Sequence, residues 1–151
     1  MSTPFRLHVP RPLVEEMVAQ AVAELPNECC GLLAGRVEET TGSGRFGRVA
    51  RRYPLVNEAA SPTAYLSAPD SLFAAHKEMR RLGLDILAVY HSHPTSEPVP
   101  SRTDLANNNY PEAVHLIISL LREEPKIRGW WLSGDGFLEA EWDASDAAPS
   151  P

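Results

Sequence analysis

A near-continuous apolar run, "LDILAVY" at residues 84–90, is the feature that most restricts how this chain can fold. A strand with water on one face alternates apolar and polar residues, whereas this run is apolar at nearly every position. Such a run is typical of a central strand that is covered on both faces. The chain is therefore expected to build a sheet with other elements packed against it.

Two amphipathic helices are available to cover that sheet. Apolar residues recur at helical spacing over residues 13–25, with a proline at each end of this segment. Ser67 and Asp70 resemble a capping box ahead of a second helix, which Gly83 ends. The apolar side of the second helix is expected to contain Leu72, Phe73, His76 and Met79.

The remaining apolar segments predict strands. Their order along the chain is typical of a mixed α/β domain, in which helices pack against a single mixed sheet. The tripeptide Gly134-Asp135-Gly136 predicts the turn of a hairpin near the C-terminus. We expect the domain to span residues 5–143 and residues 144–151 to form a flexible C-terminal tail. The predicted strands are residues 29–37, 44–56, 84–90, 114–121 and the two arms of the hairpin within 127–143.

Charge and composition argue against several classes of function. A net charge of −6, with basic residues that form no single stripe, disfavours a nucleic-acid or anionic-membrane surface. No stretch approaches the ~18 consecutive apolar residues of a membrane helix, and the N-terminal residues lack the apolar core of a signal peptide. Cys29 and Cys30 are neighbours, so a bridge between them would be strained. We expect a reduced, cytoplasmic protein whose partners include neither nucleic acid nor a membrane.

Two histidines stand where the apolar strand ends, in "HSHP" at residues 91–94. If the strand continues through them, its period of two places His91 and His93 on the same side. Such a pair is a natural start for a metal site, and a hydrolytic zinc site takes three protein ligands and keeps a fourth position for water. Asp104 is the obvious third ligand, because its loop begins at the same strand end. Ser101 and Asp104 also fit a helix-capping box, so their spacing has a purely structural alternative.

Other enzymes that use an H-x-H pair fit the chain poorly. The metallo-β-lactamase pattern requires an aspartate where Thr95 stands. Zinc nucleobase deaminases require a glutamate where His93 stands, and a downstream cysteine pair. Barrel amidohydrolases are much longer than 151 residues. A cupin could use Glu97 with the two histidines, but two amphipathic helices disagree with an all-β fold.

The segment "HSHPTSEPVPSRTD" at residues 91–104 resembles the JAMM motif of the MPN-type zinc metalloproteases, including the seven residues between the second histidine and the serine. That family also has a glutamate far upstream, between the first helix and the next strand. "PNECCGLLAG" resembles this segment and places Glu28 in that role. The resemblance covers roughly residues 5–142 and implies the JAMM/MPN fold with its cytidine-deaminase-like architecture.

The resemblance also implies a role for each motif residue. His91, His93 and Asp104 would hold one Zn²⁺ per chain, and the ion would lower the pKa of its bound water toward ~7. Glu28 would take the proton of that water and pass it to the leaving amine. Ser101 would donate a hydrogen bond to the oxyanion, while its oxygen could still cap the following helix.

The compact, stand-alone form resembles bacterial and archaeal members of the family, which cut after the C-terminal Gly-Gly of ubiquitin-like or sulfur-carrier proteins. One branch releases cysteine from a carrier in cysteine biosynthesis, and another removes isopeptide-linked modifiers. A tail without side chains suits a narrow groove beside a metal, and a sheet edge there could bind it by strand addition. The resemblance allows a homodimer. The non-enzymatic alternative is an MPN-type scaffold that binds the carrier without cutting it.

The other reactive side chains are expected to be mostly structural. Cys29 and Cys30 are explained more readily as small buried residues than as metal ligands or nucleophiles. His115, and His76 in the second predicted helix, are assigned to no metal. Tyr65 and Tyr90 are candidates for substrate binding.

Overall fold

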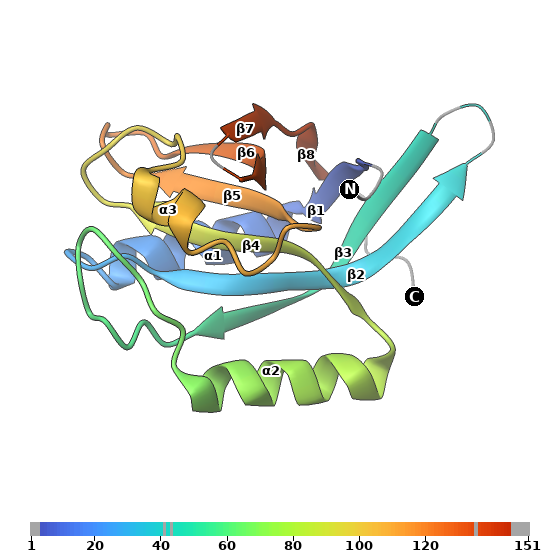
Figure 1. Ribbon diagram of the computed structural model, residues 1–151, viewed down its shortest axis with the longest axis horizontal. Coiled ribbons are helices and arrows are strands. Elements are labelled where there is room, and N and C mark those ends of the chain that lie inside the picture. The colour runs from blue at the N-terminus through green and yellow to red at the C-terminus, as the bar shows by residue number, and fades with distance from the viewer. Residues whose placement is uncertain (1–3, 41, 43, 135, 146–151) are drawn as a thin grey trace.

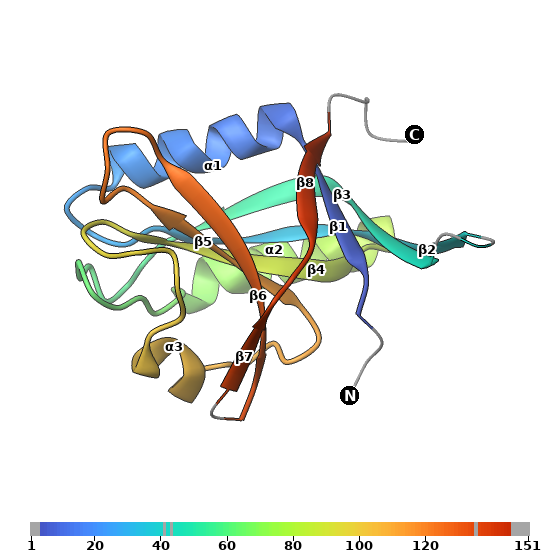
Figure 2. The same ribbon diagram turned by 90° about the horizontal axis from the view of Figure 1, so that it is seen from above.

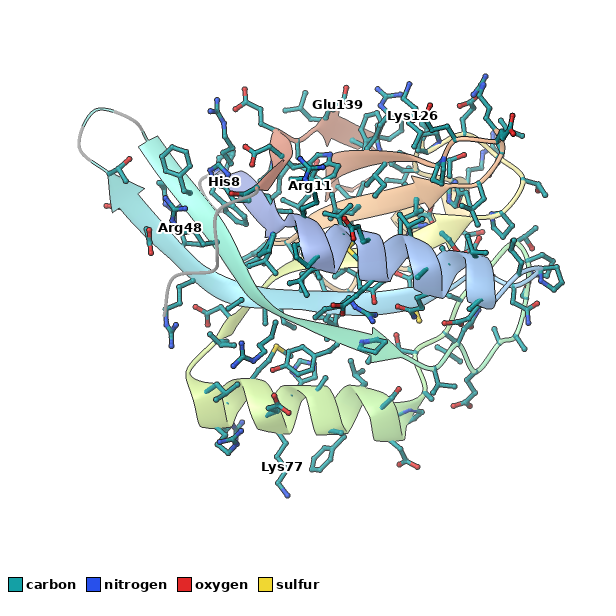
Figure 3. The ribbon with its side chains drawn as sticks, turned by 180° about the vertical axis from the view of Figure 1, so that it is seen from behind. His8, Arg11, Arg48, Lys77, Lys126 and Glu139 are labelled. Atoms are coloured by element: carbon teal, nitrogen blue, oxygen red, sulfur yellow. The ribbon has the colours of Figure 1, made fainter. Side chains whose placement is uncertain are left out.

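The structure, a computed structural model, describes residues 4–40, 42, 44–134 and 136–145. In this part of the chain the strands form one mixed eight-stranded sheet in the order β7-β6-β5-β4-β2-β3-β1-β8. Helix α2 runs along one face of the sheet and α1 crosses the other (Figures 1 and 3). The predicted α/β class is confirmed. The elements are β1 Arg6–Pro10, α1 Arg11–Ala23, β2 Cys30–Thr40, β3 Gly44–Leu55, α2 Pro69–Leu82, β4 Asp85–His93, α3 Arg102–Ala106, β5 Val114–Ser119, β6 Lys126–Ser133, β7 Gly136–Glu139 and β8 Trp142–Ser145.

Strand β4 lies inside the sheet and is buried on both faces, as its apolar run predicts. It pairs antiparallel with β2 and parallel with β5. Val89 packs in the cluster that contains Met79 of α2, whereas Tyr90 packs in the cluster that contains Met17 of α1. Each large apolar side chain that is fully buried contributes roughly 1.5–3 kcal/mol, so the strand is firmly held. The residues that continue β4 at its C-terminal end are therefore placed on a rigid support.

Helix α2 begins later than the sequence pattern predicts. The expected capping box of Ser67 and Asp70 is not formed, because Ala68 is the N-cap residue and Pro69 is the first helical residue. Ser67 forms an isolated bridge with Asn57 instead. The fixed φ angle of a proline suits the first helical position, where no backbone N–H is needed.

The buried face of α2 also differs from the prediction. Ala75 and Met79 are buried, whereas Phe73 is 71% exposed and His76 is exposed, so placing the latter two on the apolar side was wrong. Ala75 and Met79 pack in the same cluster as Val89 of β4. Across the described residues, no helix combines the length and the apolar character needed to cross a membrane.

The C-terminal strands form both edges of the sheet. Strands β6 and β7 form the predicted hairpin, although its turn residue Asp135 lies outside the described residues. Strand β8 then pairs in parallel with β1 at the opposite edge of the sheet. Because β7 and β8 follow one another so closely, the sheet must curl strongly (Figure 2). Ala144 and Ser145, predicted to belong to a flexible tail, are part of β8; the rest of that tail, 146–151, lies outside the described residues.

Candidate metal centre and active site

The C-terminal end of β4 carries two histidines on one face of the sheet. The side chains of His91 and His93 are 2% and 6% exposed. Strand β5 stays paired to the end of β4, with Ile117 beside His91 and Ser119 beside His93. The period of two therefore holds through both histidines, as predicted. Their Nε2 atoms lie 3.1 Å apart.

Asp104 reaches the same point from α3. Its Oδ1 lies 3.2 Å from Nε2 of His91, and its Oδ2 lies 3.2 Å from Nε2 of His93. Ligand atoms bound at ~2.0–2.1 Å around a tetrahedral zinc ion stand roughly 3.3–3.4 Å from one another. The three side chains thus have nearly the mutual spacing of such a ligand set.

The outer contacts of the two imidazoles suit ligation through Nε2. His93 Nδ1 lies 2.8 Å from the carbonyl oxygen of Glu97. When this Nδ1 carries the proton and donates it, the lone pair of Nε2 faces the cluster. His91 stacks on Tyr65, with ring centroids 4.9 Å apart and ring planes inclined by 28°. No described residue hydrogen-bonds to Nδ1 of His91, so the stacking adds to the contacts of Nε2 in orienting this ring.

Charge is concentrated at this cluster. Burial alone would raise the pKa of Asp104, but hydrogen bonds from His91 and His93 outweigh burial and hold this pKa well below its usual range. For His93, burial by itself would lower the pKa. Hydrogen bonds to Asp104 and to the Glu97 carbonyl outweigh this effect, so the pKa of His93 is raised above its ordinary value. The carboxylate therefore favours positive charge beside it. A divalent cation can supply that charge in place of the imidazole protons.

A short helix presents Asp104 to the histidines. Ser101 Oγ accepts a hydrogen bond from the N–H of Asp104 at 3.0 Å, and Asp104 Oδ2 accepts one from the N–H of Ser101 at 2.9 Å. This reciprocal capping box confirms the structural interpretation of Ser101. Asp104 belongs both to the cap and to the charged cluster. Ser101 itself is exposed, and its role toward an oxyanion stays a prediction.

Glu28 is a buried carboxyl beside this cluster. The residue is 4% exposed, and no described residue hydrogen-bonds to its Oε1. Burial raises the pKa of Glu28 to about 7; the charge of His93 opposes this rise and that of Asp104 adds to it. A buried carboxyl with a free acceptor and a pKa near neutrality is suited to exchange a proton with a water molecule.

A cavity of about 330 Å³ opens beside His91 and Asp104. Tyr65 forms part of its wall, and strand residues such as Leu32 and Val89 contribute apolar surface. The cavity therefore leads from an apolar region to the charged cluster. Its lining also includes Leu55, Leu72, Asn107, Asn109, Tyr110 and His115.

The two cysteines are buried, as expected, and so is His115. Burial raises the pKa of Cys29 to about 11 and that of Cys30 to about 12, so both remain thiols at neutral pH. Burial lowers the pKa of His115 to about 4, which keeps this imidazole neutral. Its Nε2 lies 3.2 Å from the carbonyl oxygen of Tyr110, within hydrogen-bonding distance.

The two tyrosines considered for substrate binding lie on opposite faces of the sheet. Tyr65 lines the cavity and contacts His91. Tyr90 is fully buried toward α1, where its hydroxyl donates to Gln20 and accepts from Arg52. Since neighbours in a strand point to opposite faces, Tyr90 cannot share the face of the histidines. Tyr90 is a core residue, and its proposed contact with substrate was wrong.

Ser92, between the two histidines, has a positional role that the sequence did not reveal. It is fully buried, and its Oγ accepts a hydrogen bond from the N–H of Cys29 at 2.8 Å. This bond ties β4 to the residue after Glu28. The sequence gives one sign of this role: Ser92 is a small polar residue in a buried strand, and strand alternation directs its side chain to the face opposite the histidines.

Comparison with known proteins places this geometry in a family. The family model of the prokaryotic homologs of the JAB domain matches residues 10–133. The chain belongs to this JAB-domain family. The match confirms the resemblance to the JAMM/MPN proteins that the motif indicated.

Several relatives of this JAB domain are known. A probable TtuB-protein conjugate cleaving protease of Thermus thermophilus is 45% identical over 100 residues, which are 66% of this chain and 61% of that protein. A desampylase of Haloferax volcanii is 37% identical over 120 residues, 79% of each chain. A CysO-cysteine peptidase of Mycobacterium tuberculosis is 35% identical over 107 residues, 71% of this chain and 68% of the peptidase. A protein of Desulfitobacterium hafniense shares the fold in solution, with a TM-score of 0.81 at 34% identity over 93% of this chain and 94% of that one.

Proposed function

We propose that this JAB domain is a zinc metallopeptidase. It hydrolyses the peptide or isopeptide bond after the C-terminal Gly-Gly of a ubiquitin-like or sulfur-carrier protein. The observation that carries the proposal is the convergence of His91, His93 and Asp104 beside the buried carboxyl of Glu28. The names of the relatives support this substrate class, because they refer to cleavage of a protein conjugate, to desampylation and to CysO-cysteine.

The donor set fits zinc. Two imidazoles and one carboxylate are typical protein ligands of a hydrolytic zinc site, and their mutual spacing agrees with a tetrahedral arrangement that leaves a fourth position for water. When bound, zinc acts as a Lewis acid and lowers the pKa of a bound water toward ~7. The contacts of Tyr65 with one imidazole and of the Glu97 carbonyl with the other hold both rings in place for this role.

Glu28 acts as the proton carrier in this proposal. Its buried carboxyl accepts a proton from the attacking water and donates it to the departing amine. Burial supports this role because it brings the pKa of Glu28 to about 7, where both protonation states are accessible. The free acceptor Oε1 is available for the hydrogen bond to water.

Ser101 can combine its two roles. The cap occupies a lone pair of Oγ, which accepts the N–H of Asp104. The hydroxyl proton remains available for donation to an oxyanion that develops on the scissile carbonyl.

The carrier tail occupies the cavity beside the metal centre. Strand β4 is paired with β2 on one side and β5 on the other, so the histidines do not lie next to a free sheet edge. The cavity instead offers apolar surface for the residues that precede the two glycines. The side-chain amides of Asn107 and Asn109 in its lining can hydrogen-bond the backbone of an extended tail.

The test is the hydrolysis of a Gly-Gly carrier fused to cysteine and of the same carrier linked to a lysine side chain. Glu28→Gln should keep zinc and fold but lower turnover on the order of 10²–10⁴-fold, because an amide cannot accept the proton. Glu58→Gln, a change of the same kind at an exposed residue of the loop after β3, is the control and should have normal turnover. Normal turnover of Glu28→Gln would refute the role of Glu28. A wild-type protein that binds the carrier but cleaves neither adduct would be a scaffold.

A further inference from the structure

The backbone of Glu28 lies outside the regular ladder of the sheet. Pairing between β2 and β4 begins with Cys30 beside His91, and Glu28 precedes that pair in the chain. The ladder therefore does not by itself determine where the Glu28 carboxyl points. Other contacts have to hold this segment.

Ser92 of β4 holds the neighbouring Cys29, and the contacts to Glu28 itself come from the loop that follows β3. The N–H of Glu28 donates to the carbonyl oxygen of Ser61 at 2.8 Å. The carbonyl oxygen of Glu28 accepts a hydrogen bond from Nδ2 of Asn57 at 2.9 Å. Both backbone polar groups of Glu28 are thus bound by one loop, and the side chain of Asn57 makes one of the two bonds.

The amide of Asn57 is saturated by backbone groups. Its Nδ2 also donates to the carbonyl oxygen of Ala64 at 3.1 Å, and its Oδ1 accepts from the N–H groups of Ala59 at 3.1 Å and Leu66 at 2.9 Å. A side-chain amide has two donor hydrogens and two acceptor lone pairs, and all of them are used here. Asn57 is 9% exposed, so these bonds are shielded from water.

The same amide also holds the backbone on either side of Tyr65, the residue that stacks on His91. Tyr65 stands between Ala64 and Leu66, which are both bonded to Asn57, and its ring stacks on His91. One buried side chain therefore connects the backbone that carries the Glu28 carboxyl with the backbone that carries the ring against His91.

We propose that Asn57 is a positioning residue that sets the place of the Glu28 carboxyl relative to the metal centre. The proposal rests on the proposed function, in which Glu28 is the proton carrier. A general base must stay within hydrogen-bonding reach of the water that it activates, and a misplacement of about 1 Å can cost on the order of 100-fold in rate. Asn57 never touches substrate in this scheme and acts on proton transfer through the backbone of Glu28.

The test variant is Asn57→Asp. It keeps both acceptor contacts of the loop but replaces the donor to the Glu28 carbonyl with an oxygen, which repels that carbonyl. We expect kcat to fall on the order of 100-fold, with KM changed by less than about threefold and zinc content unchanged. Asn57→Ala, which lacks every contact of the amide, is the second variant in case Asn57→Asp does not fold, and it should lose kcat at least as strongly.

Ser71→Ala is the matched control. Ser71 Oγ accepts the N–H of Val56, next to Asn57, and so supports the same loop without contacting Glu28. This variant should keep its kcat. If Ser71→Ala lost kcat as strongly as Asn57→Asp, general loosening of the loop would explain the effect and the proposal would fall.

Two further measurements separate positioning from other roles. In a double-mutant cycle, Asn57→Asp should cause no further loss of kcat in the Glu28→Gln background; a full additional 100-fold loss would show that Asn57 acts independently of Glu28.

Amide hydrogen exchange of zinc-loaded protein should be about tenfold faster at Glu28 in Asn57→Asp than in wild type, and unchanged exchange there would contradict positioning. A fully active Glu28→Gln variant would refute the proposed function. The exchange measurement would still test whether Asn57 positions the Glu28 backbone, because it does not depend on activity.

Discussion

Ser101 offers the sharpest test of the site, because its observed role as a helix cap and its proposed role as an oxyanion donor affect different measured quantities. In the structure its Oγ accepts the N–H of Asp104, and α3, which this bond caps, spans only Arg102–Ala106. Replacement by alanine removes that acceptor and also removes the hydroxyl proton. The first loss acts on the helix that carries Asp104, a proposed metal ligand, and the second acts on the proposed reaction.

The two effects differ in size. Loss of an N-cap costs about 1 kcal/mol. Because α3 presents Asp104, this cost should appear as weaker zinc binding, by at most about fivefold in Kd. Loss of an oxyanion donor lowers kcat on the order of 10²–10³-fold. Zinc affinity measured by competition with a chelator, together with kcat at saturating zinc, therefore distinguishes the cap from the donor.

Ser101→Asp completes the test. An aspartate still caps a helix well, but its carboxylate would repel the oxyanion as it forms. We expect a variant that folds, binds zinc and is nearly inactive. Normal kcat of either variant at saturating zinc would refute the oxyanion role and leave Ser101 as a cap only.

Three other changes test the metal and its support. His93→Ala should reduce zinc from about one ion per chain to near none by elemental analysis, since only two protein ligands remain, and full retention of zinc would refute the assigned ligand set. Ser92→Ala should lower the free energy of unfolding by about 1–3 kcal/mol, because the buried N–H of Cys29 loses its acceptor. Gly31→Ala should lower it by about 1–3 kcal/mol, because the new Cβ would overlap the ring of Tyr90. Urea denaturation measures both, and an unchanged midpoint in either variant would contradict the corresponding contact.

Local patterns in the sequence were enough to predict the parts of the site that depend on neighbours in the chain. Strand alternation placed His91 and His93 on one face, and the spacing of Ser101 and Asp104 predicted their capping box. The apolar run before them predicted a buried central strand. In each case the controlling geometry extends over only a few residues, so it can be read without knowledge of the fold.

Glu28 could be found only through the family resemblance. The side chain reaches the cluster because β2 and β4 pair antiparallel, with Cys30 beside His91. No local rule predicts that two distant segments pair in this register. The role of Asn57, which binds the Glu28 backbone, depends on the same long-range arrangement.

Tertiary packing also determined the structure of two segments for which local sequence patterns gave a wrong prediction. Ala144 and Ser145 looked like the start of a frayed tail, but β1 provides a partner strand for them. Phe73 looked like a core residue of α2, yet the sheet contacts the side of the helix that carries Ala75. The amino-acid sequence by itself determined which residue types were available and how they repeat locally. Which face becomes buried, and which distant residue approaches the candidate metal site, depended on the pairing of strands far apart in the chain, because burial is a property of the assembled sheet.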